Sequence, residues 1–240
     1  MLAVLVLLLV CTHAVGFVPS WQPARLKSLG LTFEPGDIVS SVEACSFEQR
    51  PGCVLLAQPG EHDHFLSKAA VFIFEHNKQG TQGVILTRPH AFSMGETAPG
   101  IDRVFEPNTI FIGGEQGPDM AIMFHKYDLD GMSKYVGGGI YVGGLRQARE
   151  RIERREAVPN DFKFIFNTVQ WAPGQLESEI AQKRWDVVKL PPEMVVEQKK
   201  ASALWSNARN SLRSSNGGAL NDADNSREEE DDDEENSIEL

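Results

Sequence analysis

The chain has 240 residues, of which 41% are apolar and 24% are charged, and its formal net charge is −11. This composition is ordinary for a globular domain with a core, and it excludes collagen-like, disulfide-rich and wholly disordered chains. Residues 220–240 carry eleven acids and one Arg, which leaves a net charge of −1 for the remainder. A nearly neutral folded part argues against a nucleic-acid binder, which usually presents a basic face.

The amino end predicts a signal peptide over residues 1–16. Residues 2–10 form an unbroken apolar run, which is shorter than the roughly 20 residues that span a bilayer. Ala14 and Gly16 supply small residues two positions apart, the pattern of a signal peptidase site. An apolar first strand or a membrane anchor is the alternative.

Residues 17–40 predict a second, transit-peptide-like leader. Arg25 and Lys27 are the charged residues between Phe17 and Phe33, and the first acid after them is Glu34. The junction at residues 14–19 resembles the bipartite leaders of algae whose plastids have extra membranes. That resemblance implies a mature protein in the plastid stroma, and a secreted or endomembrane-lumen protein is the alternative. No later apolar run reaches 18 residues, so the mature chain is expected to stay out of the membrane.

The main domain is expected over residues 41–192. Short apolar runs bounded by Gly, Pro and Asn predict strands at 54–57, 69–74, 83–87, 109–112, 120–124, 139–142, 162–166 and 185–190. The turn at 77–82 predicts one hairpin, and the glycines between 112 and 120 predict a second one joining 109–112 to 120–124.

Helical patterns are fewer and come late in the chain. Helices are expected at 145–156 and 174–184, and residues 193–213 are expected to form one peripheral helix that begins near Pro192. Residues 214–240 predict a disordered acidic tail. Because strands precede helices without regular alternation, the fold class is α+β, with a mixed, largely antiparallel sheet in a single compact domain and a few flanking helices.

Three separated stretches resemble the YqgE/AlgH family. They are Pro59, Asp63, Phe65, 70–73, Glu75-His76, Gly80, 83–86 and Arg88-Pro89; then Phe111-Ile112-Gly113-Gly114; then 171–177 with Glu179. The resemblance implies one compact α+β domain with a coiled, partly bifurcated sheet. The family's biochemical activity is not established, although the AlgH name carries a transcriptional-regulator label.

This chain departs from the family pattern at three places. Thr87 stands where Asn usually precedes Arg-Pro, and Glu115 stands where Pro is common. Residues 167–170 replace an approach to the Trp that is usually rich in Gly and Ala. The fold is expected to tolerate these changes, whereas a ligand contact made by the usual Asn would not carry over.

The candidate binding residues are Glu75, His76, Arg88, Gly113, Gly114, Trp171 and Gln175. Each has a packing alternative. Glu75 and His76 are neighbours on a strand and point to opposite faces, so they are either pocket residues or a polar strand end. Arg88 can bind a carboxylate or phosphate, or it can pair with Glu75. The double glycine allows close backbone approach, and Trp171 either stacks on a planar ligand or plugs the core.

No catalytic motif is recognised, and no cofactor or metal is predicted. His62-Asp63-His64 resembles a ligand set but is better explained as a turn, and Cys45 and Cys53 match no zinc spacing. The expected function is therefore a non-catalytic module that binds an unknown protein or small molecule in a plastid. The alternatives are a regulator of gene expression and a hydrolase-like enzyme that uses His76 or His125 as its base.

Overall fold

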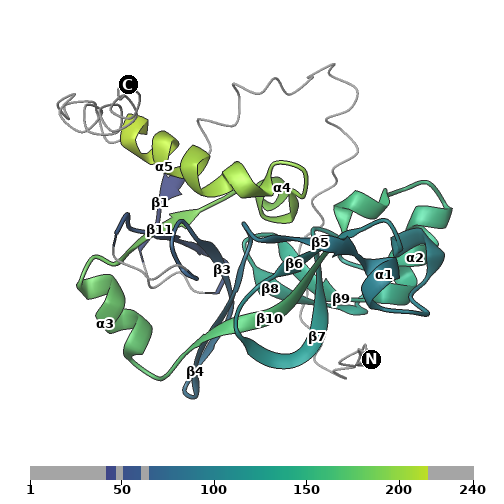
Figure 1. The fold of residues 1–240 in the computed structure, drawn as a ribbon, viewed down its shortest axis with the longest axis horizontal. Coiled ribbons are helices and arrows are strands. Elements are labelled where there is room, and N and C mark those ends of the chain that lie inside the picture. The colour runs from purple at the N-terminus through teal and green to yellow at the C-terminus, as the bar shows by residue number, and fades with distance from the viewer. Residues whose placement is uncertain (1–41, 47–50, 61–64, 216–240) are drawn as a thin grey trace, which may run out of the picture.

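The computed structural model describes residues 42–46, 51–60 and 65–215, and its strands form one long, strongly coiled sheet (Figure 1). The predicted leader (1–40), His62-Asp63-His64 and residues 216–240 of the predicted tail lie outside the described residues. The tail prediction is wrong for residues 214–215, which belong to the last helix. The strands are β1 (Glu43–Ala44), β2 (Val54–Ala57), β3 (Ala70–Asn77), β4 (Gly80–Ile85), β5 (Pro89–Ser93), β6 (Thr109–Ile112), β7 (Gln116–His125), β8 (Ser133–Gly137), β9 (Ile140–Gly143), β10 (Lys163–Trp171) and β11 (Trp185–Lys189). The α-helices are α1 (Met94–Thr97), α2 (Leu145–Glu153), α3 (Gln175–Ala181), α4 (Pro192–Val196) and α5 (Leu204–Ser215).

Strand β10 is the centre of the sheet, because it pairs with three other strands. The strand order is β1-β11-β2-β3-β4-β10-β7-β9-β8, and β5 and β6 form a side branch that joins at β10. One edge of β10 pairs with β7 in antiparallel fashion. The opposite edge pairs with β6 in parallel at residues 164–166 and then with β4 in antiparallel fashion at residues 169–171. The sheet therefore forks along a single strand, and most of its pairings are antiparallel, as expected for this α+β fold.

The double glycine Gly113-Gly114, from the second stretch that resembles the family, lies at this fork. The amide of Gly113 donates to the carbonyl of Phe166 over 2.6 Å, and the carbonyl of Gly113 accepts from the amide of Ile85 over 2.8 Å. A Cβ atom at Gly113 would lie 2.5 Å from Cγ2 of Ile165, and one at Gly114 would overlap the carbonyl group of Thr168. These glycines therefore serve the close backbone approach that the sequence offered as their packing alternative.

Asn167 lets β10 change partners at the fork. Its φ of 60° lies in the left-handed region, and the register with β7 shifts between Phe166 and Thr168. Asn is among the few residues other than Gly that adopt this conformation at small cost. The departure from a Gly- and Ala-rich approach is therefore compatible with the fold.

The predicted hairpin between 109–112 and 120–124 is wrong. Strands β6 and β7 both pair with β10, which lies between them. The hairpin of β3 and β4 is confirmed, with Asn77 opposite Gly80 at its turn. Strands β5 and β8 were not predicted, and β10 runs to Trp171 rather than ending at Phe166.

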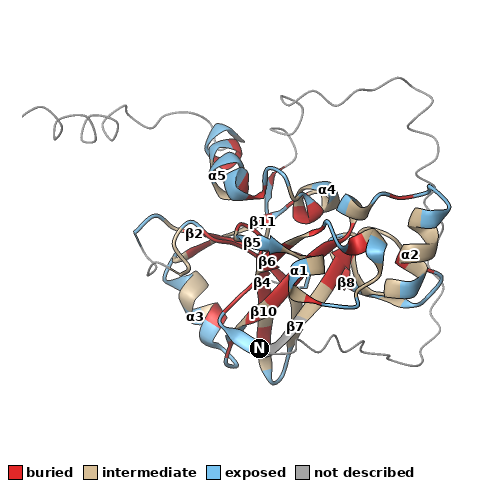
Figure 2. Cartoon of the chain, turned by 45° about the vertical axis from the view of Figure 1, so that its right-hand side comes forward, coloured by how far each residue is buried: buried red, intermediate tan, exposed pale blue. Residues whose placement is uncertain are grey.

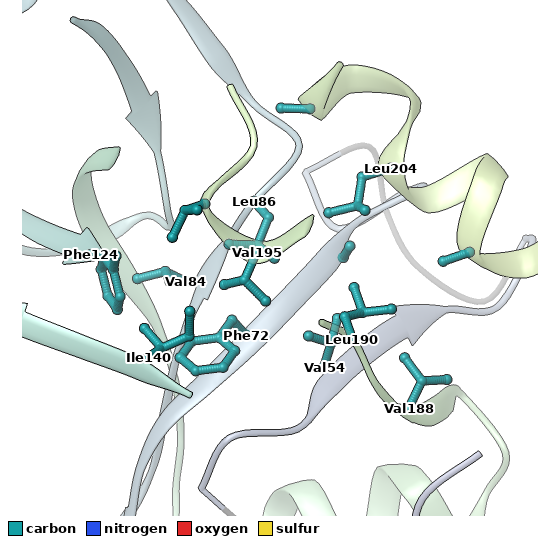
Figure 3. Packing of buried hydrophobic residues seen from close by; sticks show 14 of the residues in the cluster. Val54, Phe72, Val84, Leu86, Phe124, Ile140, Val188, Leu190, Val195 and Leu204 are labelled. Atoms are coloured by element: carbon teal, nitrogen blue, oxygen red, sulfur yellow. The ribbon is translucent and has the colours of Figure 1, made fainter. Parts of the chain in front are cut away.

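Three apolar clusters fill the faces of the coiled sheet, and Figure 2 shows the buried strands between exposed helix faces. Alternation along β2 sends Val54 and Leu56 into the largest cluster and Leu55 and Ala57 into the opposite one. Helices α4 and α5 cover the first cluster, which Figure 3 shows around Phe72. Helix α3 covers the opposite cluster, and α1 and α2 accompany the third, beside β6, β7 and β10.

The single helix expected over 193–213 is interrupted. Helix α4 ends at Val196, and α5 begins at Leu204 after a short 3₁₀ turn at Ala201–Ala203. Helix α5 is also more than peripheral, because Leu204, Ala208 and Leu212 are buried in the largest cluster.

The interruption supplies acceptors for Lys163, which is fully buried at the start of β10. Its Nζ donates to the carbonyls of Leu86, Val195 and Glu197 over 3.1, 3.4 and 2.9 Å and lies 4.1 Å from the ring centroid of Phe111. Burial lowers the pKa of Lys163 to about 7, against the attraction of Glu197. Since a continued helix would use the carbonyls of Val195 and Glu197 internally, the break makes these two acceptors available to the buried lysine.

Gly114→Ala is expected to lower the free energy of unfolding by about 3 kcal/mol, because the added methyl group meets backbone that cannot rotate away. Urea unfolding followed by circular dichroism measures the loss. Gly100→Ala is the control, since its Cβ atom would meet nothing within 4 Å and the cost is that of its φ of 95°, about 1 kcal/mol. Equal losses in the two variants would contradict a crowded fork.

Candidate functional site

In the third stretch that resembles the family, the carboxylate of Glu179 accepts hydrogen bonds from two tryptophan side chains, an arrangement that we call the clasp. Both indole N–H groups donate to its Oε2 atom, that of Trp171 over 3.1 Å and that of Trp185 over 2.8 Å. The two indole rings meet edge to face, with centroids 6.1 Å apart. Trp171 is only 4% exposed. Its ring is therefore used for packing and is not available to stack on a planar ligand.

Gln175 completes the clasp and starts helix α3. Its Oε1 accepts from the backbone amide of Ala172 over 3.0 Å, and its Nε2 donates to Oε1 of Glu179 over 3.2 Å. Gly174 precedes it with a φ of 78°, which turns the chain from β10 into the helix. The motif thus fixes where α3 begins and how it docks on the sheet.

Arg88 is hydrogen-bonded to the loop that contains Phe65 and Ser67. Its Nη2 donates to the carbonyls of Phe65 and Ser67 over 3.3 and 2.6 Å. No ion pair joins Arg88 to Glu75 within the described ranges, so the alternative of a pairing across the hairpin is wrong. Instead Glu75 accepts from the side chain of Asn77 over 2.9 Å. The guanidinium is therefore partly satisfied by backbone before any ligand arrives.

His76 faces the strand beside it. Its Nδ1 lies 2.7 Å from Oγ1 of Thr81, the residue opposite it in β4, and Thr81 is in turn opposite Trp171 in β10. The amide of Ile112 donates to the carbonyl of Arg88, next to Gly113. The seven candidate residues consequently fall into two groups near opposite ends of β4. Glu75, His76, Trp171 and Gln175 lie near its start, and Arg88, Gly113 and Gly114 lie beyond its end.

His125, the other suggested base, is completely buried. Its Nε2 donates to the carbonyl of Gly143 over 2.9 Å, and its Nδ1 accepts from the amide of Tyr127 over 3.3 Å. These two partners define the neutral tautomer protonated at Nε2. Desolvation by burial lowers the pKa of His125 to about 4, although the hydrogen bond to the carbonyl of Gly143 works in the opposite direction. Neither ring nitrogen is left for a substrate.

A further opening in the described surface is lined by none of these residues. A cavity of about 690 Å³ is lined by Pro51–Gly52, Tyr135–Gly138 and Lys189–Leu190. Its walls are two turns in contact, because Cβ atoms at Gly52 or Gly137 would overlap the backbone of the other turn. Sequence patterns did not predict this site, because its segments are far apart in the chain and clustered glycines were their signal in the sequence.

Within residues 42–46, 51–60 and 65–215, no three His, Cys, Asp or Glu side chains are grouped as metal ligands. Cys45 and Cys53 are not joined by a disulfide. None of the helices described there is both long and apolar enough to cross a bilayer.

The fold and the clasp together define an α+β domain built on a forked, coiled sheet. The family model described as AlgH-like (DUF179) matches residues 54–216, which is more than half of the chain. The chain therefore belongs to the AlgH-like family. That match includes α5, which agrees with the burial of this helix in the largest cluster.

Relatives are found in bacteria. A UPF0301 protein of Chlorobium limicola is 29% identical over 148 residues, covering 61% of this chain and 78% of the relative. One of Chlorobaculum tepidum is 27% identical over 170 residues, covering 70% and 88%. The AlgH protein of Pseudomonas aeruginosa has a solution structure that covers 75% of this chain and 99% of its own, with a TM-score of 0.54 and 19% identity. A crystal structure from Corynebacterium diphtheriae covers 68% and 86%, with a TM-score of 0.56 and 22% identity. These two structures support the fold.

Glu179→Ala is expected to lower the free energy of unfolding by about 2–4 kcal/mol, because two nearly buried indole N–H groups lose their acceptor. Urea unfolding followed by tryptophan fluorescence measures this. Glu153→Ala, which removes an exposed helix pair with Arg149, serves as the control and should cost about 0.5 kcal/mol. A Glu179→Ala variant as stable as the control would contradict the clasp.

Acidification is expected to destabilise the fold through His125. The unfolded chain takes up its proton near pH 6.5 and the folded chain only near pH 4, so this contribution is complete above pH 6.5 and is lost as pH falls toward 4. The total is about 3 kcal/mol. Urea unfolding at pH 7, 6, 5 and 4 measures it, and His125→Gln should flatten the slope. If the unfolding free energy of His125→Gln depends on pH as strongly as that of the unaltered protein, groups other than His125 are responsible.

Proposed function

We propose that this chain is a non-catalytic binding module that holds a small molecule in the cavity lined by the turns at Gly52 and Gly137. The cavity is the observation that carries this proposal. Its volume of about 690 Å³ lies within the range of small-molecule sites, roughly 300–1,000 Å³.

The roles of the signature residues support a binding site away from them. Gly113 and Gly114 close the fork, Trp171 and Gln175 form the clasp, and Arg88 holds the loop at Phe65. These internal contacts leave the seven candidates with few groups for a ligand. By contrast, Tyr135 is 58% exposed at the cavity, so its ring is accessible to another molecule.

The lining also favours binding over catalysis. Tyr135 and Lys189 are its polar side chains, and none of the described lining residues is an acid, His, Ser or Cys. A hydrolytic site needs a nucleophile or activated water beside a base that can accept a proton at neutral pH. The cavity offers instead a ring, a cation and backbone groups.

A thermal-shift experiment tests the binding function. Small-molecule fractions of a plastid extract are added to the domain, and at least one is expected to raise Tm by several degrees because a ligand that binds only the folded state stabilises it. Tyr135→Ala should lose the shift. Phe92→Ala, which removes a similarly exposed ring elsewhere, should keep it. A shift that survives in Tyr135→Ala, or no shift with any fraction, would refute the cavity as the site.

We also propose that the module works in the plastid stroma. The support is the leader, with an apolar run followed by an acid-poor segment that starts at Phe17. A fluorescent protein fused behind residues 1–45 is expected to reach the plastid interior in an algal cell with a complex plastid. Phe17→Ala should divert it to the endomembrane system. Secretion of the unaltered fusion would contradict this address.

A further inference from the structure

Tyr135 presents a fixed aromatic ring at the rim of the cavity. Its ring meets that of Tyr141 edge to face, with centroids 5.1 Å apart, and its hydroxyl accepts from the amide of Gly139 over 3.3 Å. The ring is held on two sides and is still 58% exposed. A held ring with an exposed face loses little entropy when another ring stacks on it.

Lys189 places a positive charge on the same cavity. It ends β11, is exposed, and has no ion pair within the described part of the chain. The acid Glu43 lies directly opposite Lys189 where β1 pairs with β11. An ammonium without an ion pair attracts an anionic group, and Glu43 weakens that attraction.

Two glycine-containing turns form much of the remaining described wall and contribute no side-chain charge. Gly52, Gly137 and Gly138 have φ values of 105°, 92° and 59°, which other residues adopt only with strain, and the two turns touch through backbone. The described lining residues include no carboxylate, so they offer a cationic ligand no ion-pair partner. The cavity thus combines a ring, one cation and close access to backbone.

We propose that the ligand is an aromatic anion of about the size of a nucleoside monophosphate, with its ring stacked on Tyr135 and its phosphate or carboxylate paired with Lys189. This inference rests on the proposed binding function and adds the chemical class of the ligand. Both halves of the molecule are required, because neither an exposed stack nor an exposed ion pair is strong alone.

Titration calorimetry with adenosine monophosphate, adenosine and inorganic phosphate as probes tests the class. Adenosine monophosphate is expected to bind at least tenfold more tightly than adenosine, and inorganic phosphate alone should give no measurable heat. The advantage of the monophosphate should shrink as salt is raised, because the charges are near solvent. Equal affinity for adenosine and its monophosphate, or no binding of either at millimolar concentration, would overturn the proposal.

Four variants separate the two contacts. Tyr135→Ala should weaken both adenosine compounds about tenfold, whereas Tyr135→Phe keeps the ring and should stay within about twofold. Lys189→Ala should remove most of the advantage of the monophosphate and leave adenosine unchanged, and Lys78→Ala in the β3–β4 turn is its control. Glu43→Gln should tighten the monophosphate severalfold and leave adenosine unchanged. A monophosphate affinity indifferent to Lys189 and Glu43 would overturn the charge pairing.

The experiments distinguish a failure of the aromatic-anion proposal from a failure of the proposed binding function. If an extract fraction shifts Tm in a Tyr135-dependent way but adenosine monophosphate does not bind, the cavity is a ligand site and the aromatic-anion class is wrong. If neither the fractions nor the probe acts at the cavity, the binding function itself fails.

Discussion

Strand β10 must satisfy three neighbouring strands along nine residues, and this requirement shapes the rest of the domain. One edge of β10 pairs first with β6 and then with β4. Backbone groups are needed where the pairing changes from one strand to the other. Gly113 supplies them through hydrogen bonds to Phe166 and Ile85. The same strand begins at buried Lys163 and ends at Trp171, so it also anchors the interrupted carboxyl-terminal helices and the indole clasp.

The residues that carry the family resemblance have structural roles in this chain. Gly113 and Gly114 permit the fork, Glu179 gathers two indoles, and Arg88 closes a loop with its guanidinium. These contacts occupy the indole N–H group of Trp171 and part of the Arg88 guanidinium. Membership in the AlgH-like family therefore defines the architecture of this protein, while its proposed chemistry lies in a cavity formed by Gly52, Gly137 and their neighbours.

Local patterns predicted much of this fold, and long-range pairings account for most of the errors. Apolar runs located β2, β3 and β11, and the turn at Asn77 located one true hairpin. The parallel pairing of β6 with β10 joins residues more than fifty positions apart, which no local pattern reports. The break after Val196 depends on Lys163, a residue that looks like an exposed strand position in the sequence. The cavity was invisible for the same reason, because three distant segments form it.

Native-state hydrogen exchange of the amides of Gly113 and Ile85 tests the central role of the fork most directly. These amides donate to Phe166 and to Gly113, respectively. If the fork is the element on which the sheet depends, both should exchange only when the whole domain unfolds, with protection equal to the free energy of unfolding. Exchange of either amide as fast as that of Gln79, in the exposed β3–β4 turn, would show that the fork opens independently and would contradict the account.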